Sequence, residues 1–122
     1  MDILFLEYPP CSTCKKARSW LDQHNVSYSA RHIVENNPSA DELKAWHERS
    51  GLPVKRFFNT SGKLYRELNV KEQLEAGMTD KEVYALLAQN GMLVKRPLLI
   101  IDGVPLTPGF KESEWKAALE IK

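Results

Sequence analysis

The chain has 122 residues, and 43% of them are hydrophobic, so it can bury one real core but has no room for a second domain. Seventeen basic and sixteen acidic side chains leave a formal net charge of +1. Such a balance offers no electrostatic argument for a nucleic acid or a membrane as a partner. We therefore expect a single domain over residues 1–122 that binds neither directly, and its function has to be inferred from a local site.

The N-terminus does not resemble an export signal. Met1-Asp2 leads directly into the short apolar run 3–6 and then into Pro9-Pro10, without the basic start or the longer apolar core of a signal peptide. No stretch has the apolar length needed to span a bilayer. The expected compartment is therefore the cytoplasm, where thiols stay reduced unless they are in use.

Both cysteines of the chain lie where a predicted strand is followed by a predicted helix. The apolar run Ile3–Leu6 predicts a buried strand, and helical periodicity extends from about Ser12 to His24, with Ser12 or Thr13 able to cap its start. Cys11 and Cys14 are two residues apart at this junction. The residues at core-facing spacing along the predicted helix are Ala17, Trp20, Leu21 and His24.

A cysteine in the first turn of a helix is stabilised as a thiolate, because the N–H groups there have no intrahelical partner and the peptide dipoles add. Cys11 is therefore the predicted nucleophile. Cys14, one turn further along, is placed to attack a mixed disulfide formed at Cys11. Lys15, Lys16 and Arg18 add positive charge nearby, which solvent screens.

Three other readings of the cysteine pair are open. A structural disulfide across a two-residue gap constrains the unfolded chain little. A metal site would need His24, His32 or His47, whose spacings do not make the usual Cys-Cys-His-His arrangement. Two inert cysteines are the third reading. A redox dithiol is the reading we favour, and we expect no metal.

The middle of the chain has a helical pattern. Residues 26–34 alternate as a second strand, which completes a βαβ unit and makes His32 a structural residue. From about residue 38 to residue 91, two capping boxes (Ser39 with Glu42, Thr79 with Glu82) and short helical pieces over 52–58 and 64–68 predict a helical block that ends at Asn90-Gly91. Its large apolar residues are expected in the core, with a contact surface as the alternative: Trp46, Phe57, Phe58 and Tyr65.

Two strands and a helix complete the chain. The apolar run Leu98–Ile101 predicts a buried strand, and Asp102-Gly103 has the chemistry of a two-residue hairpin turn. Pro105 places the returning strand at a sheet edge. After a break at 108–110, a final helix is expected around Glu114–Leu119.

The order strand, helix, strand, helical block, strand, strand, helix, with a dithiol after the first strand, resembles the thioredoxin/glutaredoxin-like α/β fold. This resemblance implies a mixed four-stranded sheet with a helical insertion at about 38–91. In that fold a cis proline precedes the third core strand and packs beside the dithiol. Pro97 occupies the matching place, so the resemblance implies a cis Arg96–Pro97 bond, although cis is a minority state for such bonds generally.

Five motifs along nearly the whole chain resemble the arsenate reductase family in the broad sense. Carried over by position, Cys11 matches the family's nucleophile and Arg96 an arginine that holds the oxyanion. The expected catalytic residues are therefore Cys11, Cys14 and Arg96, and the expected substrate-binding residues are Ser12, Thr13, Lys15 and Pro97. The motifs are Cys11–Ala17, Phe57–Gly62, Leu68-Asn69, Leu93–Pro97 and Pro108–Phe110.

The resemblance implies two functions of different classes. One is a reductase of a small oxyanion or disulfide that takes electrons from glutathione and glutaredoxin or from thioredoxin, with no bound cofactor. Asn59 and Pro108–Phe110 stand where the family's arsenate reductases carry further arginines, and neither replaces a bidentate arginine. Cys14 stands where those enzymes generally have serine. The other function is a redox sensor like the Spx and MgsR transcriptional regulators of the same family, which would bind the RNA polymerase α subunit.

Overall fold

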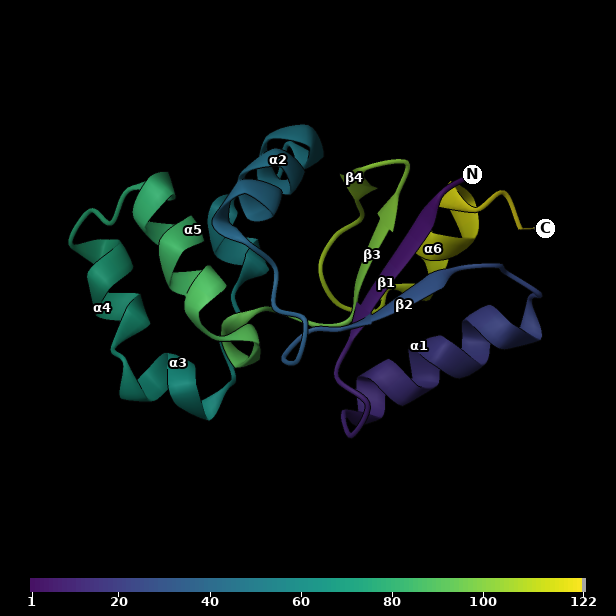
Figure 1. The fold of residues 1–122 in the computed structure, drawn as a ribbon, viewed down its shortest axis with the longest axis horizontal. Coiled ribbons are helices and arrows are strands. Elements are labelled where there is room, and N and C mark those ends of the chain that lie inside the picture. Colours follow the sequence, from purple (N-terminus) through teal and green to yellow (C-terminus); the bar gives the residue numbers. More distant parts are fainter. Residues whose placement is uncertain (122) are drawn as a thin grey trace.

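A mixed four-stranded sheet forms the centre of the computed structural model, which describes residues 1–121 (Figure 1). The strand order is β2-β1-β3-β4, with β1 parallel to β2 and antiparallel to β3, and β3 antiparallel to β4. Leu98–Ile101 forms the predicted buried strand, and the hairpin turns at Asp102-Gly103, where both residues have positive φ. The strands are β1 (Ile3–Glu7), β2 (Ser29–His32), β3 (Leu98–Ile101) and β4 (Val104–Pro105).

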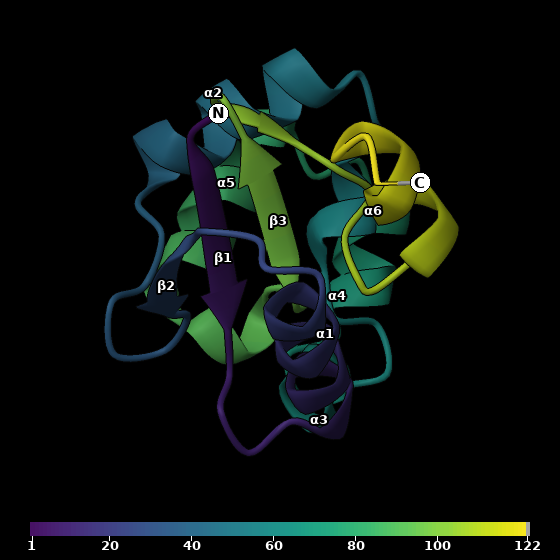
Figure 2. The same ribbon diagram turned by 90° about the vertical axis from the view of Figure 1, so that its right-hand side faces the viewer.

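The helices cover the sheet from two sides. Figures 1 and 2 show α1 and α6 on one face and the block α2 to α5 on the other. The two helices on the first face are α1 (Ser12–Gln23), which begins directly after Cys11, and α6 (Glu112–Ala118), near the C-terminus. The block comprises α2 (Ala40–Ser50), η1 (Val54–Phe57), α3 (Lys63–Glu67), α4 (Val70–Glu75), α5 (Asp80–Gln89) and η2 (Gly91–Leu93).

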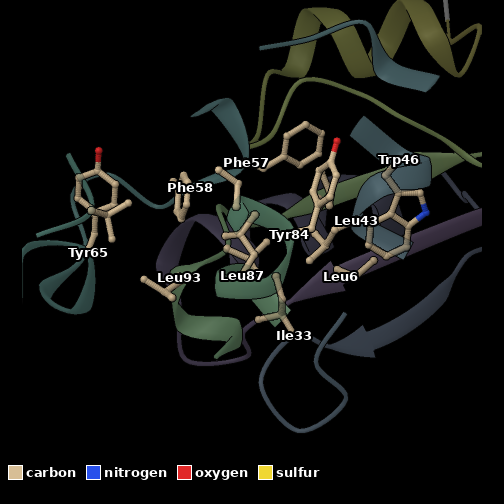
Figure 3. Packing of buried hydrophobic residues seen from close by; sticks show 14 of the residues in the cluster. Leu6, Ile33, Leu43, Trp46, Phe57, Phe58, Tyr65, Tyr84, Leu87 and Leu93 are labelled. Carbon is tan, nitrogen blue, oxygen red and sulfur yellow. The ribbon is translucent and has the colours of Figure 1, made fainter. Parts of the chain in front are cut away.

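Two hydrophobic clusters pack on opposite faces of the sheet. One lies under α1 and α6 and includes Phe5, Trp20 and Trp115. The other lies between the sheet and the helical block and is larger (Figure 3). For four aromatic residues the sequence left open whether they belong to the core or to a contact surface. All four are buried in this second cluster, so the core prediction is confirmed: Trp46, Phe57, Phe58 and Tyr65.

The local signals of the sequence are confirmed. Both capping boxes form, with Ser39 accepting a hydrogen bond from the Glu42 backbone and Thr79 accepting one from the Glu82 backbone. The Arg96–Pro97 peptide bond is cis, as the resemblance implies. These features, the element order and the sheet topology make the fold thioredoxin-like.

Four details differ from the prediction. Neither Ser12 nor Thr13 caps α1, because the N-cap residue is Cys11, whose side chain makes no capping hydrogen bond. The second strand is shorter than 26–34 at both ends. At its start the Val26 N–H still donates to the Leu21 carbonyl of α1, and at its end the His32 ring accepts hydrogen bonds from two following backbone amides and turns the chain. His24 is exposed and not core-facing, since its ring lies against Trp20 at the end of α1. Phe58, inside the stretch predicted as helical, instead forms an isolated antiparallel bridge with Val94.

None of the helices in the described part of the chain combines the length and the apolar character that crossing a membrane requires.

Candidate active site

The two cysteines lie at the start of α1, directly after the Pro9-Pro10 turn. The turn is closed by the Cys11 backbone N–H, which donates to the Tyr8 carbonyl at 2.9 Å. Both thiols are free; the Cys11 side chain is half-buried, whereas Cys14 has no exposed surface. The predicted pair is therefore asymmetric, with one sulfur that an external molecule can reach and one that it cannot.

The surroundings of Cys11 favour its charged form. Burial acts to raise the pKa of the Cys11 thiol, but the backbone N–H of Cys14, the Cys14 thiol, the backbone N–H of Thr13 and the positive charge of Arg96 together outweigh burial and lower it. Most of these groups belong to the first turn of α1, where amides without intrahelical partners attract a thiolate. Cys11 therefore has the chemistry of a nucleophile.

Cys14 has the opposite chemistry. Burial is the main cause that raises the pKa of Cys14 to about 12, and the neighbouring Cys11 adds to the increase, while the Tyr8 backbone N–H and Arg96 oppose it. The Tyr8 N–H donates to the Cys14 sulfur at 3.5 Å. With this pKa Cys14 is a protonated thiol at neutral pH, and its sulfur lies against the residue that follows β1.

Arg96 belongs to the site, because its charge acts on both sulfurs. Its guanidinium lies over the Tyr8 ring, 5.1 Å from the centroid, and its Nη1 donates to the Met92 carbonyl at 3.3 Å. Its Nε is buried and has no hydrogen-bond partner among the described residues. The side chain is half-buried and not freely solvated. The guanidinium therefore lies near the dithiol with N–H groups that can still donate to a bound molecule.

The bridge between Phe58 and Val94 brings the middle of the chain to Arg96. The Asn59 N–H donates to the Leu93 carbonyl at 2.8 Å, and a cavity of about 270 Å³ has both Asn59 and Arg96 in its lining. Asn59 and Arg96 therefore line the same cavity, to which Asn59 contributes an amide and no charge.

A buried ion pair lies behind the dithiol, and sequence reasoning missed it. Glu7, at the end of β1, is 6% exposed and accepts hydrogen bonds from Arg18, whose Nε lies 3.1 Å from the carboxylate. The positive charge that Arg18 was predicted to add near the dithiol is therefore paired with the Glu7 carboxylate. The burial of Glu7 could not be predicted from the neighbouring sequence, because charged residues at strand ends are usually exposed and only the folded chain buries this carboxylate.

The remaining predicted residues surround the pair. Ser12, Thr13 and Lys15 are exposed in the first turn of α1, and Lys16 is exposed on the next. Pro97 is buried, and its carbonyl accepts a hydrogen bond from the Gly109 N–H at 2.9 Å. Across residues 1–121, no group of three His, Cys, Asp or Glu side chains is arranged to hold a metal ion.

A thioredoxin-like sheet with a dithiol at the start of its first helix, a cis proline and a helical block defines a thiol redox fold. The sequence model of the ArsC family, the arsenate reductase family in the broad sense, matches residues 6–118. The chain therefore belongs to the ArsC family.

Individual relatives cover almost the whole chain. The uncharacterised protein YusI from Bacillus subtilis (strain 168) is 51% identical over 116 residues, which is 95% of this chain and 97% of YusI. The global transcriptional regulator Spx from Staphylococcus haemolyticus (strain JCSC1435) is 30% identical over 114 residues, 93% of this chain and 84% of Spx. The crystal structure of an ArsC family related protein from Bacteroides fragilis matches with a TM-score of 0.89 and 54% identity over 96% of this chain and 97% of that chain.

Proposed function

We propose that this protein is a thiol–disulfide oxidoreductase, with Cys11 as the nucleophile and Cys14 as the resolving thiol. The observation that carries the proposal is the asymmetry of the pair: Cys11 is accessible and its pKa is lowered, whereas Cys14 is fully buried and its pKa is raised to about 12. Two structural or inert thiols would have no need of opposite electrostatic surroundings two residues apart.

The reaction with a disulfide substrate proceeds in two exchanges. The Cys11 thiolate attacks one sulfur of the substrate, forms a mixed disulfide and releases the other sulfur as a thiolate. Cys14 then attacks the Cys11 sulfur, its proton leaving with the departing thiolate or to solvent, and the Cys11–Cys14 disulfide forms. The dithiol loses two electrons and the substrate gains two. Two thiols of glutathione, with or without glutaredoxin, or the dithiol of thioredoxin restore the reduced pair.

Arg96 is proposed to stabilise the negative charge that each exchange produces, together with the first turn of α1. Ser12, Thr13 and Lys15 would contact the substrate at the open end of this turn, and Pro97 would form its wall. An oxyanion such as arsenate is the less favoured substrate, because Asn59, which lines the same cavity as Arg96, stands where the family's arsenate reductases carry an arginine, and an amide does not replace a bidentate guanidinium.

The test is consumption of NADPH by the purified protein, coupled to regeneration of glutathione or of thioredoxin, with arsenate and a small disulfide offered in parallel. We expect turnover with the disulfide and its loss in Cys11→Ser. Cys14→Ser should retain the first exchange and accumulate the mixed disulfide, visible by intact mass. Turnover equal to that of Cys11→Ser with every substrate contradicts the proposal.

The second candidate is a redox-sensing regulator that binds the RNA polymerase α subunit. The observation in its favour is the 30% identity to Spx over 93% of the chain. In this case the Cys11–Cys14 disulfide would be the signal and not a turnover intermediate. The test is capture of the RNA polymerase α subunit by this chain with and without oxidant. A change of binding on oxidation in wild type but not in Cys14→Ser would support the regulator, and equal binding with and without oxidant would exclude a redox-sensing role.

A further inference from the structure

Between η1, the segment after η2 and the segment before α6 the structure forms a basic pocket, although the net charge of the whole chain is close to zero. We define it as the cavity of about 420 Å³ lined by Lys55, Arg56, Phe58, Thr60, Lys95, Pro108 and Lys111. Four of its seven lining residues are cations and none is acidic, although the whole chain carries only +1. From this concentration of charge we propose that the basic pocket binds a small polyanion, a molecule that carries two or more phosphate or carboxylate groups.

The four cations have no counterion of their own. Among residues 1–121, the ion pairs involve Arg18, Arg31 and Lys63 and none of the pocket cations. The acidic residues that follow Lys111 are bound elsewhere, since Glu112 accepts from the Trp20 indole N–H and Glu114 from the Thr107 backbone. Positive charges gathered without a partner repel one another, and an anion in their midst removes that repulsion.

The cations come together because of the fold and not because of their spacing in the sequence. Lys55 and Arg56 lie in η1, Lys95 follows η2, and Lys111 precedes α6. The bridge between Phe58 and Val94 joins the first two segments, since the Lys95 N–H donates to the Phe57 carbonyl at 2.8 Å.

The third segment is joined to the site by a hydrogen bond near the cis proline. The Gly109 N–H donates to the Pro97 carbonyl at 2.9 Å, which brings Pro108 and Lys111 to the pocket. Lys95 is the residue directly before Arg96, and the lining of the pocket contains none of the side chains assigned to the redox chemistry.

The size and lining of the basic pocket favour a small molecule. Its volume lies within the range of ligand sites, roughly 300–1,000 Å³, and a nucleic acid strand would instead need a basic groove that continues along its backbone. Phe58 and Pro108 are buried and give the pocket an apolar wall. The Thr60 hydroxyl can donate to an anion beside the lysines.

The experiment is calorimetric titration of the full chain with inorganic pyrophosphate and, separately, with the tricarboxylate citrate, at constant ionic strength. The variant Lys55→Gln/Lys95→Gln/Lys111→Gln removes three pocket charges. The matched control Lys44→Gln/Lys71→Gln/Lys81→Gln removes three exposed charges from α2, α4 and α5 and leaves the same net charge. We expect saturable binding by wild type, weakened at least about tenfold in the pocket variant and less than about twofold in the control.

The two probes separate the sources of the anion, since tighter binding of one of them identifies phosphate or carboxylate groups as the preferred chemistry. Cys11→Ser should bind as wild type does, so failure of the proposed redox function leaves this result intact. Binding that does not saturate, or that weakens equally in both triple variants, means only general attraction to a positive surface and overturns the proposal. A loss of folding in the pocket variant is recognised by its thermal unfolding, and Lys95→Gln alone then replaces it, with Lys71→Gln as control.

Discussion

The two faces of the sheet differ in how much apolar surface they bury and in the polar groups that they hold. The face under the helical block is packed by a large aromatic and aliphatic cluster, and the polar side chains near it are paired in two capping boxes, the Arg31–Glu42 ion pair and the hydrogen bond between His47 and Tyr84. The face under α1 and α6 has a smaller cluster, and at its end it buries Glu7 with Arg18 and the Cys14 thiol. Apolar burial stabilises the first face, whereas the second gives up some of that burial to hold groups whose chemistry can change.

The largest effect that distinguishes the faces is expected from Trp115→Ala. Trp115 is fully buried and makes edge contacts with Phe5 and Trp20, at centroid distances of 6.3 and 6.1 Å. Its removal should lower the free energy of unfolding by about 3–5 kcal/mol. Because Trp20 lies on α1, the variant should also change the rate at which iodoacetamide alkylates Cys11.

The matched variant is Leu43→Ala, in the cluster of the opposite face, with an expected cost of about 2–5 kcal/mol. Denaturant unfolding measures the stability of both. If the faces are independent, Leu43→Ala leaves the alkylation rate of Cys11 unchanged. A similar change of this rate in both variants would show that the reactivity of Cys11 depends on overall stability and not on the packing under α1. Trp115→Phe should cost less than Trp115→Ala, because Phe retains an aromatic ring against Phe5 and Trp20. The indole N–H that both variants remove has no partner among the described residues, so no hydrogen bond is lost with it.

The next effect concerns how the helical block is attached to the sheet. Gly91 is buried, and a Cβ atom there would overlap the Ile33 carbonyl and lie 3.0 Å from the Asn37 side-chain oxygen. Gly91→Ala should therefore cost about 1–3 kcal/mol through displaced backbone. Gly51→Ala is the control: no atom lies within 4 Å, and its φ of +70° alone should cost about 1 kcal/mol. Equal losses of stability in denaturant unfolding would contradict the close contact at Gly91.

Local patterns allowed most of the fold to be predicted. Of the parts that failed, the bridge between Phe58 and Val94 depends on a distant contact, and the end of strand β2 on a local one that alternation does not show. The capping boxes, the Asp102-Gly103 turn and the apolar runs each act within a few residues, so the sequence shows them directly. Strand β2 was predicted too long at its C-terminal end because His32 ends it through its own ring.

The same division holds for the site. Cys11, Cys14 and Arg96 were found through motifs, and the structure brings them together. The Tyr8 ring under Arg96, the buried carboxylate of Glu7 and the basic pocket were not found, because each joins segments that are remote in the sequence or depends on burial that composition does not reveal.

A smaller and pH-dependent effect is expected at the start of the helical block. Arg31 donates to both carboxylate oxygens of Glu42, at 2.7 and 2.9 Å, and this contact is the main reason that the pKa of Glu42 falls to about 2. The Glu42 side chain is 38% exposed, so the pair should contribute only about 1 kcal/mol.

The folded-state pKa of Glu42 lies below its usual value of 4.5, so its stabilisation is complete above about pH 4.5 and is lost as the pH falls through about 2. Arg31→Gln should therefore unfold at lower denaturant than wild type at pH 7, and the difference should shrink across that acidic window. A difference that stays constant down to pH 2 would assign the effect to the hydrogen bonds that Arg31 makes to the Asn36 and Asn37 carbonyls instead.

The smallest expected effect tests how the site face controls its nucleophile. Arg96 lowers the pKa of Cys11, but less than the backbone N–H groups of Cys14 and Thr13 do. Arg96→Met keeps the length of the side chain and removes its charge, so the pKa of Cys11 should rise modestly. The thiolate is the reactive form, so the pH profile of iodoacetamide alkylation should move to higher pH. Cys14 does not interfere, because its pKa of about 12 keeps it protonated, and intact mass confirms a single alkylation.

Arg66→Met is the control for this last variant, because Arg66 is exposed and only donates to the Ser61 carbonyl at 3.4 Å. It should leave the alkylation profile in place. If Arg96→Met also leaves the profile in place while lowering turnover, Arg96 acts on the substrate and the first turn of α1 alone sets the pKa of Cys11. If it moves the profile and lowers turnover together, the one guanidinium acts on both, which its position over Tyr8 with an unpartnered Nε in the described chain allows.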